Sequence, residues 1–299
     1  MPFFFHKYGM DIYMGLRITW ALVAATYLMT LVVEWPFVAL SFRKEPHWFR
    51  SSVIGSLLIQ SASYILLFGG YWLVSGTSLY TSMQVTNAEA MPAPSGVVMF
   101  FISSSDGDVY RTELGTATDI KVMKLGSTNY QDDHLELRES ETDANHWDIA
   151  AVLNRDNGRV IVPYISTKEK ISEREGWKTT TYYGWGSSPF QAGIVTNSDW
   201  HIGWAHWPDI GIWARNGSET VRIAYGMPFG GYTPYRVIQL PPDRALVQLD
   251  EQICIVDLAA RRIARIKKGY GMLAFKKDQI VETIVAAKQP AGFGSDQSR

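Results

Sequence analysis

The sequence contains a single cysteine, Cys254, among its 299 residues. One cysteine excludes a disulfide within the chain and any metal site that needs several cysteines. Its apolar neighbours Ile253 and Ile255 predict a buried, unreactive thiol in a strand. The sequence also lacks an excess of positive charge, since its formal net charge is −1. We therefore expect no nucleic-acid partner, because no basic stripe is available to replace the counterions of a phosphate backbone.

Motifs that carry enzyme chemistry are missing as well. The sequence contains no glycine-rich phosphate loop, no nucleophile elbow and no zinc-binding helix motif. His201 and His206 are five residues apart and would point to opposite faces of a strand, which disfavours a shared metal site. The acidic run 132–143 lacks the glycine-bearing loop of a calcium site, so we expect a solvated loop there. We predict no metal, no cofactor and no catalytic residue, and the sequence favours a protein that is not an enzyme.

Charged residues are almost absent from two N-terminal stretches. Residues 18–42 contain one, Glu34, and residues 51–76 contain none. About 20 helical residues cross the hydrocarbon core of a bilayer, so each stretch is long enough to span it. We predict a membrane anchor in residues 1–76, with transmembrane helices at about 18–42 and 51–75. The first stretch is too long for the apolar part of a cleaved signal peptide, which indicates a retained helix.

The charges on either side of the second stretch predict its orientation. Arg43, Lys44 and Arg50 lie in the short connection before it, whereas the next cationic residue after it is Arg111. Because positively charged connections stay in the cytoplasm, we expect the C-terminal domain to lie outside. The expected location is the bacterial inner membrane, with the lipid bilayer as the first partner. In an alternative arrangement, Pro36 breaks the first stretch into a re-entrant turn, which would leave the N-terminus inside too.

Glu34 is the unusual residue of the first stretch. It lies nine residues before Arg43, and Gln60 lies ten residues after Arg50, so both would lie at similar depth in an antiparallel helical hairpin. Each belongs to a series of polar residues at helical spacing, which predicts a polar seam between the helices. The series consists of Thr26, Thr30 and Glu34 in the first stretch and of Ser52, Ser56, Gln60 and Ser63 in the second.

Two roles for Glu34 follow from this placement. A carboxyl group in hydrocarbon is expected to be neutral, because an ionised group is costly there. In that form it would hold the hairpin together by bonding to Gln60, and this packing role is the one we predict. The alternative is a proton or ion relay. Two helices cannot enclose a pore, so a relay would need an oligomer or other subunits.

After residue 76 the sequence becomes polar and rich in β-forming residues. Residues 77–96 have no helical or strand period and predict an extended linker. We expect a β domain outside the cytoplasm over residues 97–280 and a disordered tail at 281–299. Within the domain, turn signals connect pairs of strand-like segments. The four predicted hairpins are 97–103 with 109–114, 148–154 with 159–165, 210–215 with 220–225, and 245–249 with 252–258, and a further strand is expected at 262–266.

The segment 244–266, "RALVQLDEQICIVDLAARRIARI", resembles the inner strands of a β-propeller blade. In such blades a strand, an acidic turn, a strand that ends in Asp-Leu and an outer strand follow one another. The resemblance implies antiparallel blades over about 97–275, although the other three hairpins lack the Asp-Leu ending. The predicted fold is therefore a transmembrane α-hairpin followed by an all-β domain of propeller-like antiparallel blades. A β-sandwich is the alternative.

Six of the eleven tryptophans lie between residues 177 and 213. Exposed aromatic rings near Asn and Asp could stack on a sugar ring or a lipid headgroup, whereas buried rings would pack between strands. The candidate binding residues are Trp185, Trp200, Trp204 and Trp207. We expect at least one of the last three in the core, because residues of both parities along a strand cannot all face outward.

Together these features predict a membrane-anchored binding or assembly module that joins a protein partner or further copies of itself outside the cytoplasm. A second hypothesis is a membrane-tethered enzyme that acts on an envelope glycan, with the aromatic region as its substrate platform. A third is an accessory subunit of an ion-translocating complex, in which Glu34 takes part.

Overall fold

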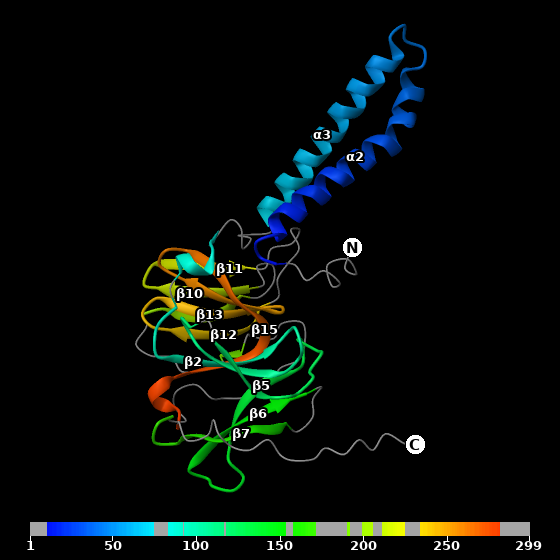
Figure 1. Ribbon diagram of the computed structural model, residues 1–299. Coiled ribbons are helices and arrows are strands. Elements are labelled where there is room, and N and C mark those ends of the chain that lie inside the picture. Colours follow the sequence, from blue (N-terminus) through cyan, green and yellow to red (C-terminus); the bar gives the residue numbers. More distant parts are fainter. Residues whose placement is uncertain are drawn as a thin grey trace, which may run out of the picture.

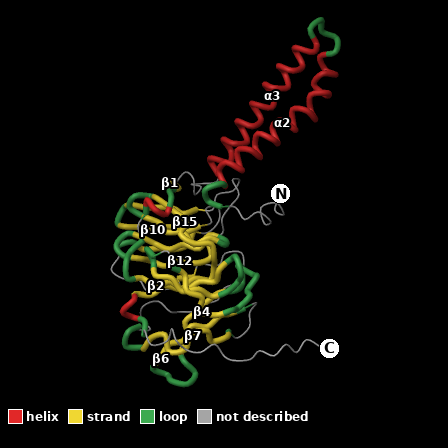
Figure 2. The backbone as a smooth tube through the Cα atoms, viewed as in Figure 1, coloured by secondary structure: helices red, strands yellow, loops and turns green. Residues whose placement is uncertain are grey.

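A computed structural model shows two long helices that project from a β domain (Figure 1). The structure describes residues 11–74, 83–91, 93–116, 118–153, 158–171, 190–191, 199–205, 211–224 and 234–281. The helices come first in the chain, and mostly antiparallel strands follow. Figure 2 separates the two parts, with the helices red and the strands yellow. The predicted fold class, an N-terminal helical hairpin followed by an all-β domain, is confirmed.

The two helices are α2 (Gly15–Phe42) and α3 (Trp48–Val74). Each contains a segment that is long and apolar enough to cross a membrane, Trp20–Phe42 in α2 and Trp48–Gly69 in α3. Helix α2 continues through Pro36 without interruption. The re-entrant turn of the alternative arrangement is therefore not present in this described helix.

Aromatic rings pack between the two helices from one end of the hairpin to the other. The pairs are Trp20 with Phe68, Tyr27 with Tyr64 and Trp35 with Phe49, with ring centroids 6.0, 5.0 and 5.7 Å apart. The outward-facing side chains are large and apolar, as for Val32 and Leu66, which are 73% and 75% exposed. An apolar surface of this extent is unfavourable in water and suits a hydrocarbon environment.

The described strands of the β domain form one nine-stranded sheet and two three-stranded sheets. The large sheet contains β1 (Gln84–Val85), β2 (Val97–Ser103), β3 (Val109–Glu113), β4 (Asp119–Met123), β8 (Phe190–Gln191), β12 (Pro234–Leu240), β13 (Arg244–Leu249), β14 (Gln252–Asp257) and β15 (Arg262–Lys276). The small sheets contain β5 (His134–Glu139), β6 (His146–Val152) and β7 (Arg159–Thr167), and β9 (His201–Ala205), β10 (Gly211–Asn216) and β11 (Glu219–Ala224). The described part of the domain also contains two single-turn 3-10 helices, η1 (Ala88–Ala90) and η3 (Lys277–Gln279).

All four predicted hairpins are present as antiparallel pairs. They are β2–β3, β6–β7, β10–β11 and β13–β14. The turns of three of them contain glycines with positive φ, Gly107 (+71°), Gly158 (+79°) and Gly217 (+55°), a conformation that glycine adopts without steric cost. Alternating apolar residues on both sides of such a turn are a local signal, which explains why the sequence alone predicts these pairs.

Strand β15 joins the parts of the domain. Its first half pairs with β14 and its second half with β2. Within the second half the register shifts between Tyr270 and Leu273, where Gly271 has a φ of +63°. A Cβ atom at Gly271 would lie 2.8 Å from the His134 Cα atom, so the start of β5 packs closely against the bend. One continuous core, which includes Phe100, Leu135 and Phe275, fills the space between the large sheet and the β5–β7 sheet.

The order of strands in the large sheet is β4-β3-β2-β15-β14-β13-β12-β8, and β1 pairs with β15 outside this path. The sheet therefore begins and ends at different strands and is open. The described strands do not close into a ring of blades, and open sheets that share a core fit the β-sandwich alternative. The segment 244–266 does form consecutive antiparallel strands, which is the local part of the propeller resemblance.

The residues directly before α2 are fixed to the β domain. Ile12 is 1% exposed and lies in a second core, and its N–H donates to Gln252 Oε1 at 3.0 Å. The Asp11 carboxylate pairs with the Arg265 guanidinium group, and the Tyr13 hydroxyl accepts a hydrogen bond from the Arg265 N–H at 3.1 Å. The start of α2 therefore lies beside the β domain, and the connection between the helices lies at the far end of the hairpin (Figure 1).

Part of the segment expected as a linker also contacts the domain. Strand β1 pairs in parallel with β15, and the flanking Met83 and Met91 are buried. At the other end of the domain, the Val281 N–H donates to the Ile165 carbonyl oxygen at 2.9 Å. The remainder of the tail predicted at 281–299 lies outside the described residues.

Candidate functional site

Among the described side chains, three hydrogen bonds join α2 to α3. They occur at successive levels along the hairpin, as an antiparallel arrangement requires. The Tyr27 and Ser61 hydroxyls are 2.9 Å apart, and the Trp35 Nε1 donates to the Ser52 hydroxyl at 3.2 Å. The remaining bond joins the Gln60 amide to the Glu34 carboxyl group. The pairs are Tyr27 with Ser61, Glu34 with Gln60, and Trp35 with Ser52.

The central pair lies where equal depth in the hairpin places it. Gln60 is buried between the helices, and its Nε2 donates to Glu34 Oε2. Glu34 itself is exposed at the outer surface of the hairpin. Gln60 is its one hydrogen-bond partner in the described part of the chain. One side of this carboxyl group is thus satisfied within the hairpin, and the other side faces outward from the middle of an apolar helix.

The other predicted members of the seam have different surroundings. The Thr26 and Thr30 hydroxyls donate to carbonyl oxygens of their own helix at 2.7–2.9 Å, so they do not bridge the helices. Ser56 is buried (2% exposed), and its hydroxyl has no hydrogen-bond partner among the described residues. Ser63 is exposed, and Ser61 occupies the interface at that level. The structure therefore brings Glu34 and Gln60 together and places Ser63 away from them.

The four candidate binding tryptophans fall into three groups. Trp200 is 2% exposed and packs in the second core. Its Nε1 donates to Asp243 Oδ1 at 3.1 Å, and its carbonyl oxygen accepts a bond from the Gln239 amide. Trp200 is therefore a core residue and not part of an exposed platform. The Trp204 backbone pairs with Ile212 between β9 and β10, whereas its side chain, Trp185 and Trp207 lie outside what the structure describes.

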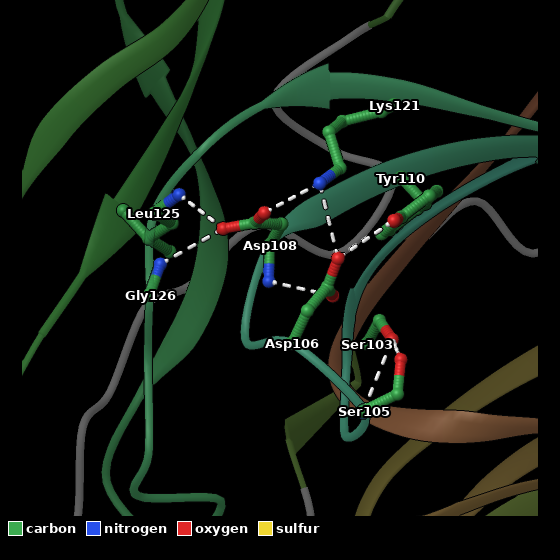
Figure 3. A network of polar contacts seen from close by, with 8 residues as sticks. All are labelled: Ser103, Ser105, Asp106, Asp108, Tyr110, Lys121, Leu125 and Gly126. Atoms are coloured by element: carbon green, nitrogen blue, oxygen red, sulfur yellow. Dashed lines mark hydrogen bonds and ion pairs between the residues drawn. The ribbon is translucent and has the colours of Figure 1, made fainter.

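A second polar cluster lies around the β2–β3 turn (Figure 3). Lys121 Nζ lies between two carboxylates, 3.1 Å from Asp106 Oδ2 and 2.6 Å from Asp108 Oδ2. The Asp108 Oδ1 accepts the backbone N–H groups of Leu125 and Gly126 at 2.8 and 3.0 Å. Both carboxylates accept hydrogen bonds or pair with Lys121. The cluster therefore connects the β2–β3 turn to the chain after β4 and has a structural role.

The pKa shifts of Asp106 and Asp108 agree with a structural role for this cluster. The hydroxyl group of Tyr110, followed by Lys121, lowers the pKa of Asp106 to about 2. Burial opposes ionisation of Asp108, but hydrogen bonds from Lys121 and the two backbone N–H groups outweigh it and lower its pKa. Neither carboxyl group is thus poised to exchange a proton near neutral pH.

A third polar cluster occupies the joint between β5 and the bend of β15. Ser127 Oγ donates to Asp133 Oδ2 at 2.5 Å and lies 2.8 Å from the Tyr270 hydroxyl. Burial, with the positive charge of Arg236, lowers the pKa of His134 to about 4, so this imidazole is neutral near pH 7. Its Nδ1 lies 2.7 Å from the Asp132 carbonyl oxygen, which makes Nδ1 the protonated nitrogen.

The acidic run 132–143 is therefore not the solvated loop that the sequence predicts. Residues 134–139 form β5, and both Asp133 (6% exposed) and Glu136 (9%) are buried with partners. The period-two alternation of Leu135 and Leu137, both buried, is the signal that identifies a strand. Across the described residues, no group of three or more His, Cys, Asp or Glu side chains is placed to hold a metal ion.

Several contributors to these sites carry no clear sequence signal. Ser61 and Trp35 bridge the helices, yet their spacing differs from that of the predicted seam. Arg236 extends from β12 to the Leu135 carbonyl oxygen at 2.9 Å, across 101 positions of sequence. Burial raises the pKa of the Cys254 thiol, which agrees with the unreactive cysteine that its apolar neighbours predict.

Neither a protein-family model nor a curated protein sequence matches this chain.

Proposed function

We propose that this protein is a membrane-anchored assembly module. In this proposal the helical hairpin spans a membrane twice, the β domain lies on the outer side, and the exposed edge of α2 at Glu34 joins a partner subunit. The length and apolar surface of Trp20–Phe42 and Trp48–Gly69 support the membrane location.

The arrangement of charges supports the orientation. The start of α2 and the β domain share one end of the hairpin, and the connection with Arg43 and Lys44 is at the other end. The side chains of Arg43, Lys44 and Arg50 are all exposed. A cytoplasmic connection would therefore place both the N-terminal segment and the β domain outside.

The observation that carries the assembly role is the exposed carboxyl group of Glu34. A carboxyl group at mid-depth of a bilayer costs on the order of 3 kcal/mol when it faces lipid. Gln60 satisfies one acceptor position from inside the hairpin. A hydrogen-bonding side chain on a neighbouring transmembrane helix would satisfy the outward side. The adjacent exposed residues Val33 (59%) and Phe37 (69%) would provide the apolar contact around that bond.

Substitutions of Glu34 test this proposal. We expect Glu34→Gln to keep the assembly, because an amide both donates and accepts hydrogen bonds at nearly the same volume. We expect Glu34→Leu to weaken the association by about 1 kcal/mol, the order of magnitude of membrane hydrogen bonds. The measurement is the association state of the full chain in mild detergent, by native mass spectrometry, as a function of concentration and of co-purified subunits.

Ser63→Leu provides a matched control, because it replaces an exposed polar residue of the same hairpin that is not assigned to the assembly edge. The control should assemble as the unsubstituted chain does. If Glu34→Leu also assembles normally, the carboxyl group does not mediate association and the proposed role of this edge is wrong.

The same carboxyl group favours a second candidate function, an accessory subunit of an ion-translocating complex. Gln cannot release a proton, so under this alternative Glu34→Gln would assemble normally but abolish the pH-dependent activity of the complex. An assembly role predicts that Glu34→Gln retains both.

A further inference from the structure

An apolar groove runs between the helices in the half of the hairpin nearest the connection. Its volume is about 380 Å³, within the range of small-ligand pockets, about 300–1,000 Å³. The walls are Leu31, Val32 and Trp35 from α2 and Phe49, Val53 and Leu57 from α3, and Ser56 also lines it. Glu34 does not line the groove, so this is a separate feature from the proposed assembly edge.

Ser56 gives the groove a polar group without a partner. It is 2% exposed, and its hydroxyl makes no hydrogen bond with any of the described residues. Serines in helices usually donate to a carbonyl oxygen of the preceding turn, as Ser52 does to Phe49 at 2.9 Å. A buried hydroxyl that lacks this bond is costly, and a turn of this side chain toward the groove would let an acceptor there satisfy it.

Three cations lie in or directly after the connection, at the end of the hairpin nearest the groove. Arg50 follows Phe49 of the groove wall directly, and Arg43 and Lys44 lie in the connection. None of the three forms an ion pair or hydrogen bond through its side chain among the residues that the structure describes, and all are exposed. Glu45 is the one acidic residue of the connection, so the net charge there is positive.

From these three observations we infer that the groove binds one anionic phospholipid. The phosphate would lie at Arg43, Lys44 and Arg50, and one acyl chain would fill the groove. Ser56 lies six residues after Arg50, about 9 Å deeper along a helix. An ester carbonyl oxygen, which follows the phosphate toward the bilayer centre, would accept a hydrogen bond from the Ser56 hydroxyl at that depth.

A lipid explains the groove better than a partner helix does. A helix with its side chains is about 10–12 Å wide and would cover the groove without entering it, whereas an acyl chain is narrow enough to enter. The inference rests on the proposed membrane insertion. If the connection is cytoplasmic, the site would face the leaflet whose surface is negative because of its anionic lipids.

Native mass spectrometry of the full chain in mild detergent tests the site, with dioleoyl phosphatidylglycerol and dioleoyl phosphatidylcholine as probes. We expect one phosphatidylglycerol molecule to be retained at concentrations at which phosphatidylcholine is not. The double substitution Arg43→Gln and Arg50→Gln should weaken retention about tenfold or more. Ser56→Ala should weaken it about threefold, the average effect of one membrane hydrogen bond.

Filling the groove tests the position of the acyl chain. Val53→Trp should abolish retention, whereas the matched control Ile65→Trp, at a position of α3 that is 71% exposed, should leave it unchanged. Equal retention of the two lipids by the unsubstituted chain, or no effect of the double substitution, would mean an annular lipid only and would overturn the inference. If Val53→Trp does not fold, the double substitution Arg43→Gln and Arg50→Gln at exposed positions still tests the site.

The two proposals fail in different ways. Extraction of the chain from membranes by alkali would overturn the membrane anchor and with it the lipid site. An integral chain that retains no phosphatidylglycerol would overturn the lipid site alone, and normal assembly of Glu34→Leu would overturn the assembly edge alone.

Discussion

Replacing Gly107 with alanine is expected to destabilise the β domain by about 3 kcal/mol or more. Gly107 has a φ of +71°, and a Cβ atom there would lie 2.0 Å from the Ser127 carbonyl oxygen and 2.6 Å from the Ser127 nitrogen. The left-handed conformation costs an alanine about 1–2 kcal/mol, and forcing two backbone segments apart costs about 1–3 kcal/mol more. The displacement would also break the hydrogen bond from the Ser127 N–H to the Gly107 carbonyl oxygen, 2.9 Å long.

Gly96 provides the control for the backbone conformation alone. Its φ of +74° matches that of Gly107, but nothing lies within 4 Å of an added Cβ atom. Gly96→Ala should therefore cost only the conformational part, about 1–2 kcal/mol. Urea unfolding of the full chain in detergent, followed by circular dichroism of the β-sheet, measures both. Equal losses in the two variants would show that the β2–β3 turn does not pack against residues 126–127 as the structure has it.

Replacing Trp200 with alanine is expected to cost about 3–5 kcal/mol, as truncations of buried aromatic residues do. The ring is 2% exposed in the second core, and its Nε1 donates to Asp243. Trp200→Phe separates the two contributions, since it keeps most of the apolar volume and loses the hydrogen bond. That variant should lose about 1–2 kcal/mol.

Unfolding midpoints of the two Trp200 variants are sufficient to decide the role of this residue. A loss below about 1 kcal/mol for Trp200→Ala, together with a loss of ligand or partner binding, would return Trp200 to the set of exposed binding residues. Trp48→Ala serves as the control, because that ring is 43% exposed at the start of α3 and its truncation should leave the β domain unaffected.

Local patterns in the sequence account for the parts of the fold that were predicted. Apolar length predicts the two helices, and equal distance from the connection predicts that Glu34 meets Gln60. Turn residues between alternating segments predict the four hairpins. In each case the signal lies within a few residues of the structure that it specifies.

The misplaced member of the polar seam has a geometric explanation. From Ser56 to Ser63 a helix turns through seven steps of about 100°, or about 20° less than two full turns. Two helices that cross at an angle touch along a stripe that slants around each surface. At the level of Ser63 the stripe has moved to Ser61 and Tyr64, which contact Tyr27. The crossing angle is a property of the pair of helices, and one helix does not reveal it.

Contacts between distant segments account for the rest. The fifteen-residue β15 pairs with three strands, β14, β2 and β1, and its N-terminal half alone resembles a blade strand. The position of Trp200 depends on Asp243 and Gln239, and that of Ile12 on Gln252, 240 positions away. Propensity and turn chemistry carry no information on such pairings. For the same reason, the choice between a closed propeller and open sheets required the structure.

The contacts of Asp11, Ile12 and Tyr13 affect how the hairpin and the β domain act together. They attach the first residues before α2 to β14 and β15, and β1, in the segment after α3, pairs with β15 as well. Both ends of the hairpin are thus connected to the same strand of the β domain. A partner that binds at Glu34 would therefore position the β domain along with the helices.

The most direct test of a membrane hairpin that holds its β domain outside is the side on which each end reacts with a membrane-impermeant maleimide. Glu141→Cys places a thiol on the β domain and Glu45→Cys places one on the connection, both at exposed positions. The native Cys254 is buried and should remain unlabelled, so it provides the background. We predict that, in spheroplasts, Glu141→Cys reacts at once and Glu45→Cys reacts only after the membrane is permeabilised. Labelling of Glu45→Cys in sealed spheroplasts, with protection of Glu141→Cys, would contradict the proposed orientation.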